Sequence, residues 1–512
     1  MIAILSGLPL LGYAPFFGPN PQHKFLKFKE KYGKIFSMYM GTQLTIVLND
    51  YSAVKEAFIT QGEIFSGRAA GFVFEYISRG KDGKIHGKNN LIFLKFVIFS
   101  LIFLTRIFLG QWRKSEESSS LCKSRFSATC LDMLSVAAAL QILQTFRDLG
   151  MGKDRMQNCI LEEAETLIEI FRANAGKPFD PLPTFNASVA NVICGMSWGR
   201  RYSHDDKRFQ KVLSGFKVIP DLLSQASPLL GFPFLRFIPG TMKNKWDTAL
   251  RAVRFNQNFT REVVLEHIQE KHEGEPRDFV DTFVNQQRAE EAVKIKTKED
   301  KVYEMEELQQ DLGTFFGAGV ETTSTSLYWA ILYMAHFPEI QKRVQREITE
   351  NTPAGFPVKV EDRSKLPYVE AVIREIQRCA NVTPFGILRC NLEETTLFGY
   401  RIPKKSTIMV NYLALNQDPT LWDEPEKFKP ERFLNKEGKI HEPPYFMPFS
   451  VGKRACIGES LARMEIFLFS ANILKNFDIL PCPSSPLPSL DEYTTGISCR
   501  PTYYKIQLSA RN

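Results

Sequence analysis

Near the C-terminus, one cysteine lies between two glycines in the segment Phe449-Ser-Val-Gly452-Lys-Arg454-Ala-Cys456-Ile-Gly458. Because glycine has no Cβ, Gly452 and Gly458 allow the backbone to come close to a flat group. A helix that begins after Gly458 would favour the thiolate form of Cys456, and nearby amide N–H groups can point at its sulfur. Arg454 can reach an acidic group at the rim of such a ligand. The segment therefore predicts a thiolate bound to a large, flat cofactor.

This segment resembles the haem-ligand loop of the cytochrome P-450 family, which reads Phe-x-x-Gly-x-Arg-x-Cys-x-Gly. The fixed positions of that pattern are all present, at Phe449, Gly452, Arg454, Cys456 and Gly458. The resemblance implies that the chain binds haem b and that the Cys456 thiolate is the axial ligand of the iron. Taken by itself, the motif leaves a buried structural cysteine in a loop as the alternative.

The composition is that of a large globular protein. The chain has 512 residues, of which 44% are hydrophobic, and no Pro/Ser/Gly-rich linker divides it, so we expect a single domain over 1–512. The net charge of +8 suits an acidic protein partner or a membrane surface. The absence of a basic-aromatic stripe argues against nucleic acid as a partner. Nine widely spaced cysteines without a Cys-x-x-Cys pair argue against zinc or iron–sulfur sites and suit reduced thiols.

Local patterns predict most of the secondary structure. Two strands are expected around the Gly41-Thr42 turn, at 35–40 and 44–48. The family resemblance implies a fold that is mainly α with a smaller β-rich lobe. Helices are expected at 25–32, 52–60, 159–173, 206–218, 243–272, 308–337 and 365–380.

Residues 91–143 do not follow the family pattern. From 91 to 110, fifteen of the twenty residues are apolar, but Lys95 and Arg106 weaken the interpretation as a membrane span. We interpret 91–109 and 115–143 as two foreign inserts, of the kind that retained introns would produce. A lineage-specific loop is the alternative.

The same region affects one expected haem contact. In the family, a tryptophan on the helix over the haem and an arginine four residues later bond the haem propionates. Trp112 fits the first position, but Glu116 stands at the second. The start of the chain differs too. A Pro/Gly-rich hinge begins at Gly7, after the short apolar stretch Met1 to Leu5, so the N-terminal anchor of microsomal members is expected to be missing. The family nevertheless implies the cytosolic face of the endoplasmic reticulum membrane.

The helix expected at 308–337 contains the segment Gly317-Ala-Gly-Val-Glu-Thr-Thr323. Each glycine inside a helix costs about 1 kcal/mol relative to alanine, so the two need a reason. Small residues let a helix lie against a flat cofactor, and a threonine hydroxyl that bonds back to the preceding turn can open the helix locally. A packing face for another helix is the alternative.

This segment resembles the family's Ala-Gly-x-Glu/Asp-Thr motif. The matching residues are Ala318, Gly319, Glu321 and Thr322. The resemblance implies that the first two lie against the haem, that Thr322 orients protons toward dioxygen and that Glu321 belongs to the proton relay. Phe315, one turn earlier, is a candidate for the substrate pocket.

Two further segments match family motifs on the cofactor side. Glu375 and Arg378 are three residues apart on one helix face, and Arg432 follows in a Pro-Glu-Arg-Phe loop. The resemblance implies that these three residues form a buried network near the haem-ligand loop.

Between these two segments, the family places a propionate-binding residue at the position of Arg389. A solvated turn arginine is the alternative at this position. The preceding residues line the substrate pocket in the family, which makes Phe385 and Ile387 candidate substrate contacts.

The resemblance is closest to microsomal, drug-metabolising animal enzymes and implies a monooxygenase. An NADPH-dependent reductase on a basic proximal face would supply electrons, and one oxygen atom would enter a small apolar substrate. Two alternatives stay open. One is an isomerase of the same fold that rearranges peroxides, against which the Glu321-Thr322 pair argues. The other is a haem-deficient, non-catalytic product, supported by the disrupted region 91–143.

Overall fold

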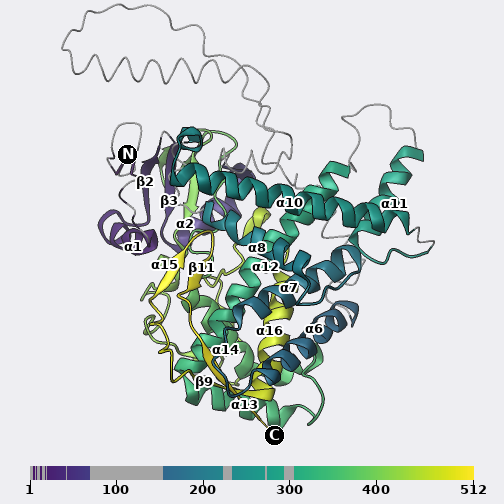
Figure 1. The fold of residues 1–512 in the computed structure, drawn as a ribbon. Coiled ribbons are helices and arrows are strands. Elements are labelled where there is room, and N and C mark those ends of the chain that lie inside the picture. Colours follow the sequence, from purple (N-terminus) through teal and green to yellow (C-terminus); the bar gives the residue numbers. More distant parts are fainter. Residues whose placement is uncertain are drawn as a thin grey trace, which may run out of the picture.

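The computed structural model describes residues 20–41, 43–69, 154–222, 233–270, 274–292 and 305–511, together with a few positions before residue 20. The proposed inserts at 91–109 and 115–143, and Trp112 between them, lie outside the described residues. The described part is mainly α-helical, and a smaller β-rich lobe lies at one side of it (Figure 1). The expected fold class is therefore confirmed.

The β-rich lobe is built around one sheet with the strand order β1-β2-β3-β8-β5-β4. Antiparallel pairing of β2 with β3 and parallel pairing of β3 with β8 bring Thr45 beside Thr407. The short strands β4 and β5 pair antiparallel, which places Arg68 opposite Arg389. The elements of this lobe are β1 Ile4–Leu5, α1 Pro21–Tyr32, β2 Ile35–Met40, β3 Gln43–Leu48, α2 Tyr51–Lys55, β4 Gly67–Arg68, β5 Arg389–Cys390, β6 Thr395–Leu397, β7 Tyr400–Ile402, β8 Thr407–Val410 and α15 Tyr412–Asn416.

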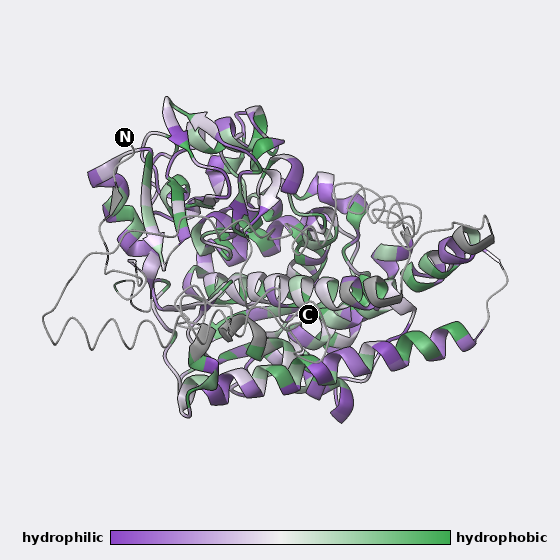
Figure 2. Ribbon diagram, turned by 90° about the horizontal axis from the view of Figure 1, so that it is seen from above, coloured by the Kyte–Doolittle hydropathy of each residue, from purple (hydrophilic) through white to green (hydrophobic). Residues whose placement is uncertain are grey.

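The helical lobe is organised around α12, which packs against α7, α10, α14 and α16. Figure 2 shows hydrophobic and hydrophilic residues alternating along the long helices, as expected for helices that bury one face. Among the described residues, none of the helices is both long and apolar enough to cross a membrane. The helices are α6 Asp154–Ala173, α7 Leu182–Trp198, α8 Lys207–Leu222, α10 Thr241–Gln269, α11 Phe279–Ala292, α12 Met305–His336, α13 Pro338–Asn351, α14 Pro367–Ala380 and α16 Glu459–Asn476.

The C-terminal tail of the chain forms short strands that pack against α12. β9 (Phe477–Pro481) pairs with β12 (Ile506–Ala510), and β10 (Tyr493–Thr495) pairs with β11 (Cys499–Pro501). The rings of Tyr328 and Tyr504 stack with centroids 4.2 Å apart, and Trp329 Nε1 donates to the Cys499 carbonyl at 2.9 Å. The tail is thus fixed against the middle of α12.

A buried ion cluster joins the end of α10 to the start of α11. His267 Nε2 lies 2.8 Å from Asp281 Oδ1 and 3.1 Å from Asp278 Oδ2. The two carboxylates and the imidazole have the spacing of metal ligands. However, Arg277 Nη2 lies 3.2 Å from the same imidazole nitrogen and its Nε donates to Asp281, so we interpret the cluster as an ion-pair network.

This cluster predicts a pH-dependent stability. Burial disfavours the His267 imidazolium, but the hydrogen bond and charge of Asp278, and those of Asp281, outweigh it and raise the pKa of His267. Arg277 holds the pKa of Asp281 at about 2 against its burial, so this carboxylate stays ionised. A raised folded-state pKa stabilises the protein fully below about pH 6.5, the unfolded value, and this stabilisation is lost as pH rises through the folded value.

His267→Gln is therefore expected to destabilise the protein by about 1.5–3 kcal/mol in mild acid, the usual worth of a hydrogen bond to a charged group. The difference in melting temperature between variant and wild type should shrink as the pH rises. Exposed His441 provides the matched control, His441→Gln. A difference that is independent of pH would contradict the assignment.

Candidate active site

The Cys456 loop is closed by backbone hydrogen bonds. The Cys456 N–H donates to the Phe449 carbonyl, and the Ala455 N–H donates to the Gly452 carbonyl, both at 2.9 Å. Gly452 has a φ of +74°, and a Cβ there would lie 1.9 Å from the Phe58 carbonyl oxygen. The close approach that requires this glycine is thus to the backbone of Phe58, and its expected place beside the cofactor stays a prediction.

Opposing effects act on the pKa of the Cys456 thiol. The residue is exposed, yet desolvation by the surrounding loop raises the pKa of its thiol, and the Glu459 charge adds to this effect. The Gly458 N–H lowers the pKa, as the helix start predicts, but does not outweigh desolvation. A bound cation removes the proton from a coordinating thiol, so a metal would complete the site.

Arg389 is the buried cation of this region. Its Nη2 donates to Ser450 Oγ at 2.8 Å and to the Val451 carbonyl at 2.9 Å, and its guanidinium lies 3.6 Å from the centroid of the Phe58 ring. Only 2% of the residue is exposed. Its Nη1 is buried without a hydrogen-bond partner among the described residues. A buried guanidinium with an unsatisfied N–H indicates a site for an anion.

Arg68 and Arg454 share this region with Arg389. Desolvation, followed by the charges of Arg389 and Arg454, lowers the pKa of Arg68 to about 10. Desolvation also lowers the pKa of Arg389 to about 10, where the Tyr412 hydroxyl opposes the shift and Arg454 adds to it. Within the described part, none of the groups that shift these two pKa values is a carboxylate. Two propionates would supply the negative charge that this cluster needs, so the residues present fit haem.

Arg68 was not among the residues that the sequence predicted to bind the cofactor. It ends the short segment Phe65-Ser-Gly-Arg68. The pairing of β4 with β5 places it opposite Arg389, and Arg454 Nε donates to the Ser66 carbonyl at 2.8 Å. In the sequence, Arg68 is one arginine after a glycine, which does not indicate a binding site. Its position becomes informative only when the sheet brings it next to Arg389.

On α12, the residues of the predicted motif face in different directions: Ala318 is exposed, whereas the two glycines face neighbouring helices. The Thr322 hydroxyl donates to the Ala318 carbonyl at 2.8 Å, which is the predicted back-bond. The helix stays α-helical throughout this segment. A Cβ on Gly319 would lie 2.7 Å from Ile193 of α7, and one on Gly317 would lie 3.3 Å from Phe216 of α8. The glycines therefore allow close packing against other helices, and the expected contacts of Ala318 and Gly319 with the cofactor stay predictions.

The candidate substrate contacts lie in different places. Phe385 is buried in the core of the β-rich lobe, with its ring centroid 4.9 Å from that of Phe25. Phe385 therefore belongs to this core, and its expected contact with substrate stays a prediction. Ile387 is 52% exposed. Phe315 makes an edge contact with Phe279 of α11, with centroids 5.4 Å apart.

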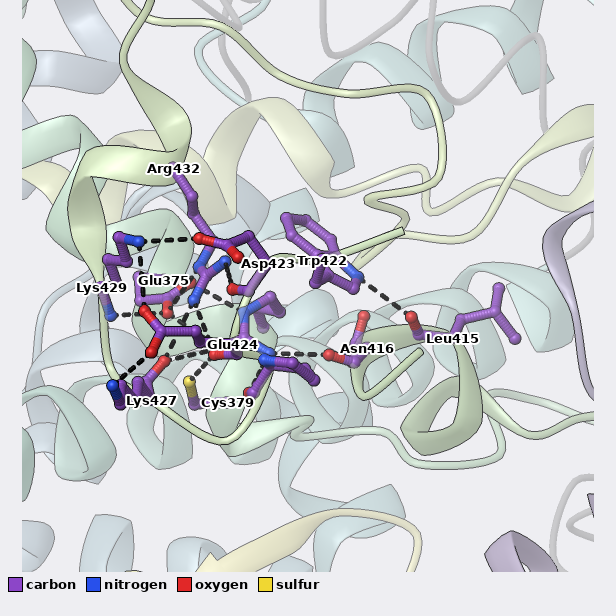
Figure 3. Close-up of polar contacts among 12 residues, drawn as sticks. Glu375, Cys379, Leu415, Asn416, Trp422, Asp423, Glu424, Lys427, Lys429 and Arg432 are labelled. Carbon is purple, nitrogen blue, oxygen red and sulfur yellow. Dashed lines mark hydrogen bonds and ion pairs between the residues drawn. The ribbon is translucent and has the colours of Figure 1, made fainter. Parts of the chain in front are cut away.

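The predicted Glu–Arg–Arg network is fully assembled (Figure 3). Glu375 receives two hydrogen bonds from Arg378, both at 2.8 Å, and one from Arg432 Nε at 2.9 Å. Arg378 Nη1 also donates to the carbonyls of Asn416 at 2.7 Å and Pro425 at 2.9 Å. The network thus connects α14 to the end of α15 and to the segments that follow it.

A sequence model of the family described as Cytochrome P450 matches residues 4–89 and 140–508. The chain belongs to the cytochrome P450 family. Cytochrome P450 2B2 of Rattus norvegicus is 32% identical over 499 residues, which cover 96% of this chain and 89% of that protein. Cytochrome P450 2H2 of Gallus gallus is 32% identical, covering 98% of this chain and 92% of that protein. Cytochrome P450 1A3 of Oncorhynchus mykiss is 31% identical, covering 98% and 89%.

Membership of this family establishes the class of chemistry. The chain is a haem-thiolate monooxygenase, an oxidoreductase that incorporates one atom of molecular oxygen. Its cofactor is haem with a cysteine thiolate ligand. The two matched stretches leave out residues 90–139, which contain Trp112 and most of the two proposed inserts. That these segments are foreign to the domain stays a prediction.

One prediction concerns the anion site. Arg389→Met removes the buried guanidinium, so haem is expected to dissociate about 10–100-fold faster, because a hydrogen bond to a charged group is worth about 1.5–3 kcal/mol. The measurement is transfer of haem to an excess of a haem-scavenging apoprotein. Exposed Arg401, which pairs with Glu394, gives the control Arg401→Met. An unchanged rate of haem loss would show that Arg389 does not hold the cofactor.

Proposed function

We propose that this chain oxidises small apolar substrates, with Cys456 as the iron ligand and with Arg68, Arg389 and Arg454 as partners of the haem propionates. When bound, the haem supplies the oxidising chemistry, which a thiolate ligand favours by pushing electron density toward the iron. The observation that carries the proposal is the unpartnered, buried Nη1 of Arg389 beside the Cys456 loop. Ile387 and Phe315 are the proposed substrate contacts.

We further propose that Thr322 and Glu321 move protons to the reacting oxygen. The Thr322 hydroxyl donates to the carbonyl of Ala318, which is exposed, and a hydroxyl can both donate and accept protons. Glu321 is the next group in the proposed relay, because its carboxyl group can take up a proton and pass it on to that hydroxyl. General acid–base assistance of this kind contributes about 10²–10⁴-fold in rate.

The proposed electron donor is an NADPH-dependent reductase that docks on the surface around the Cys456 loop. The net charge of +8 favours an acidic partner. Lys453 is exposed on this loop, and Arg463 lies on the first turns of α16. Reduction should therefore slow as ionic strength rises, because salt screens exposed charges.

The proposed location is the cytosolic face of the endoplasmic reticulum membrane. The support in the described part is an apolar tip before α10, where Phe237 is 61% exposed and Ile238 is 50% exposed. Large apolar side chains that are exposed side by side suit contact with a membrane surface.

The function is tested by isotope labelling. The purified chain, a reductase and NADPH are incubated with a panel of apolar compounds under ¹⁸O₂. A monooxygenase places one labelled atom in the product and consumes NADPH. Product that forms from an organic hydroperoxide without NADPH or dioxygen, and none under the first conditions, would instead indicate the peroxide-rearranging isomerase.

A further inference from the structure

Glu321 has a specific partner from the far end of the chain. Ser498 Oγ donates to Glu321 Oε1 at 2.8 Å. Ser498 is only 4% exposed and lies in the turn between β10 and β11, 177 positions from Glu321. A buried hydroxyl that donates to a carboxylate fixes which oxygen of that carboxylate faces it, and the second oxygen then points elsewhere.

The turn that carries Ser498 is itself held in place. The Cys499 N–H donates to the Val382 carbonyl at 2.7 Å, and the Gly496 N–H donates to the Ser498 carbonyl at 2.9 Å. On the other side, Trp329 Nε1 donates to the Cys499 carbonyl at 2.9 Å. Because Trp329 is on α12, the same helix positions both the carboxylate and the turn that holds it.

Two neighbouring hydroxyls on α12, those of Ser324 and Ser326, are already used in other bonds. Ser324 Oγ donates to the Val320 carbonyl and lies 2.7 Å from Asn186 Oδ1, and Ser326 Oγ donates to the Thr322 carbonyl at 2.8 Å. The hydrogen bond from Ser498 is therefore a tertiary contact, separate from the hydrogen bonds that hydroxyls of α12 make to their own helix.

We propose that Ser498 is a positioning residue, which holds the Glu321 carboxylate in the orientation that serves Thr322. This inference rests on the proposed role of Glu321 in the proton relay. Two outcomes compete for each dioxygen that receives two electrons from NADPH through the reductase. With ordered protons, O₂ + 2e⁻ + 2H⁺ + RH gives ROH + H₂O. With misplaced protons, O₂ + 2e⁻ + 2H⁺ gives H₂O₂.

Ser498→Ala is therefore expected to raise the share of NADPH that ends as hydrogen peroxide several-fold, with haem content and melting temperature unchanged. Ser498→Thr keeps the hydroxyl and should restore coupling to product. Ser509→Ala removes an exposed serine from β12 of the same tail and serves as the matched control. In a Glu321→Gln background, Ser498→Ala should add no further effect, because contacting residues that act as a unit are not additive.

A readout without turnover comes from the infrared difference between wild type and Glu321→Gln, which isolates the carboxylate band of Glu321. This band should shift in Ser498→Ala and stay in place in Ser509→Ala. A raised peroxide share in Glu321→Gln together with wild-type coupling in Ser498→Ala would overturn the inference alone. Wild-type coupling in Glu321→Gln would instead overturn the proposed relay.

Discussion

Replacing Arg378 with alanine is expected to abolish folded, haem-containing protein rather than merely slow turnover. The Arg378 side chain is 1% exposed, that of Glu375 is fully buried, and Arg432 Nε also bonds the same carboxylate. Removal of Arg378 leaves part of a buried charge uncompensated, which costs about 3–5 kcal/mol. It also leaves the carbonyls of Asn416 and Pro425 without their donor. Whole domains are stable by only about 5–15 kcal/mol, so this loss is decisive.

The measurement is the yield of soluble protein and its haem absorption spectrum. Arg401→Ala is the control, because Arg401 forms a bidentate pair with Glu394 on the exposed hairpin β6–β7 and should be tolerated. Arg378→Lys is expected to fail as well, since an ammonium cannot reproduce the fork of contacts that the guanidinium makes. An intact haem spectrum in Arg378→Ala would contradict the structural role given to the network.

The second large effect is expected for Cys456→Ser, which should eliminate monooxygenase activity to below detection while the fold persists. The loop is closed through the backbone of residue 456, whose N–H donates to the Phe449 carbonyl, so serine leaves this contact intact. The hydroxyl of serine cannot replace the thiolate that favours O–O cleavage.

The check is a pair of measurements on the same sample, the melting temperature and the product formed with reductase and NADPH. Cys159→Ser, at a half-buried cysteine of α6, is the control for loss of a thiol elsewhere. Wild-type activity in Cys456→Ser would exclude Cys456 as the iron ligand.

The sequence predicted the elements whose signals are local. The helix expected at 308–337 is α12 at 305–336, because Pro338 marks its end, and the strand pair at 35–48 follows from the turn residues. The segment 52–60 was expected to be one helix, but its second half, Glu56–Thr60, forms a π-helical turn. Such a change of hydrogen-bond register has no marker in hydrophobic periodicity.

The parts of the site that the sequence did not predict depend on tertiary pairing. Arg68 acquires a role only when β4 pairs with β5, and Ser498 only when the C-terminal turn reaches α12. The upward shift of the Cys456 pKa was also unexpected, because the desolvation that causes it depends on how the loop packs. Motif matching located the ligand and the arginines next to it, whereas the groups that orient them come from distant segments.

The most direct test of the central claim, haem ligation by the Cys456 thiolate, is the absorption spectrum of the full chain after reduction and addition of carbon monoxide. The account predicts a strongly red-shifted Soret band, which a thiolate ligand produces and which Cys456→Ser lacks. A folded, haem-containing chain without this band would contradict the claim. If the chain as given takes up no haem, deletion of 91–109 and 115–143 should restore the band, and a chain that stays without it after both deletions would equally contradict the claim.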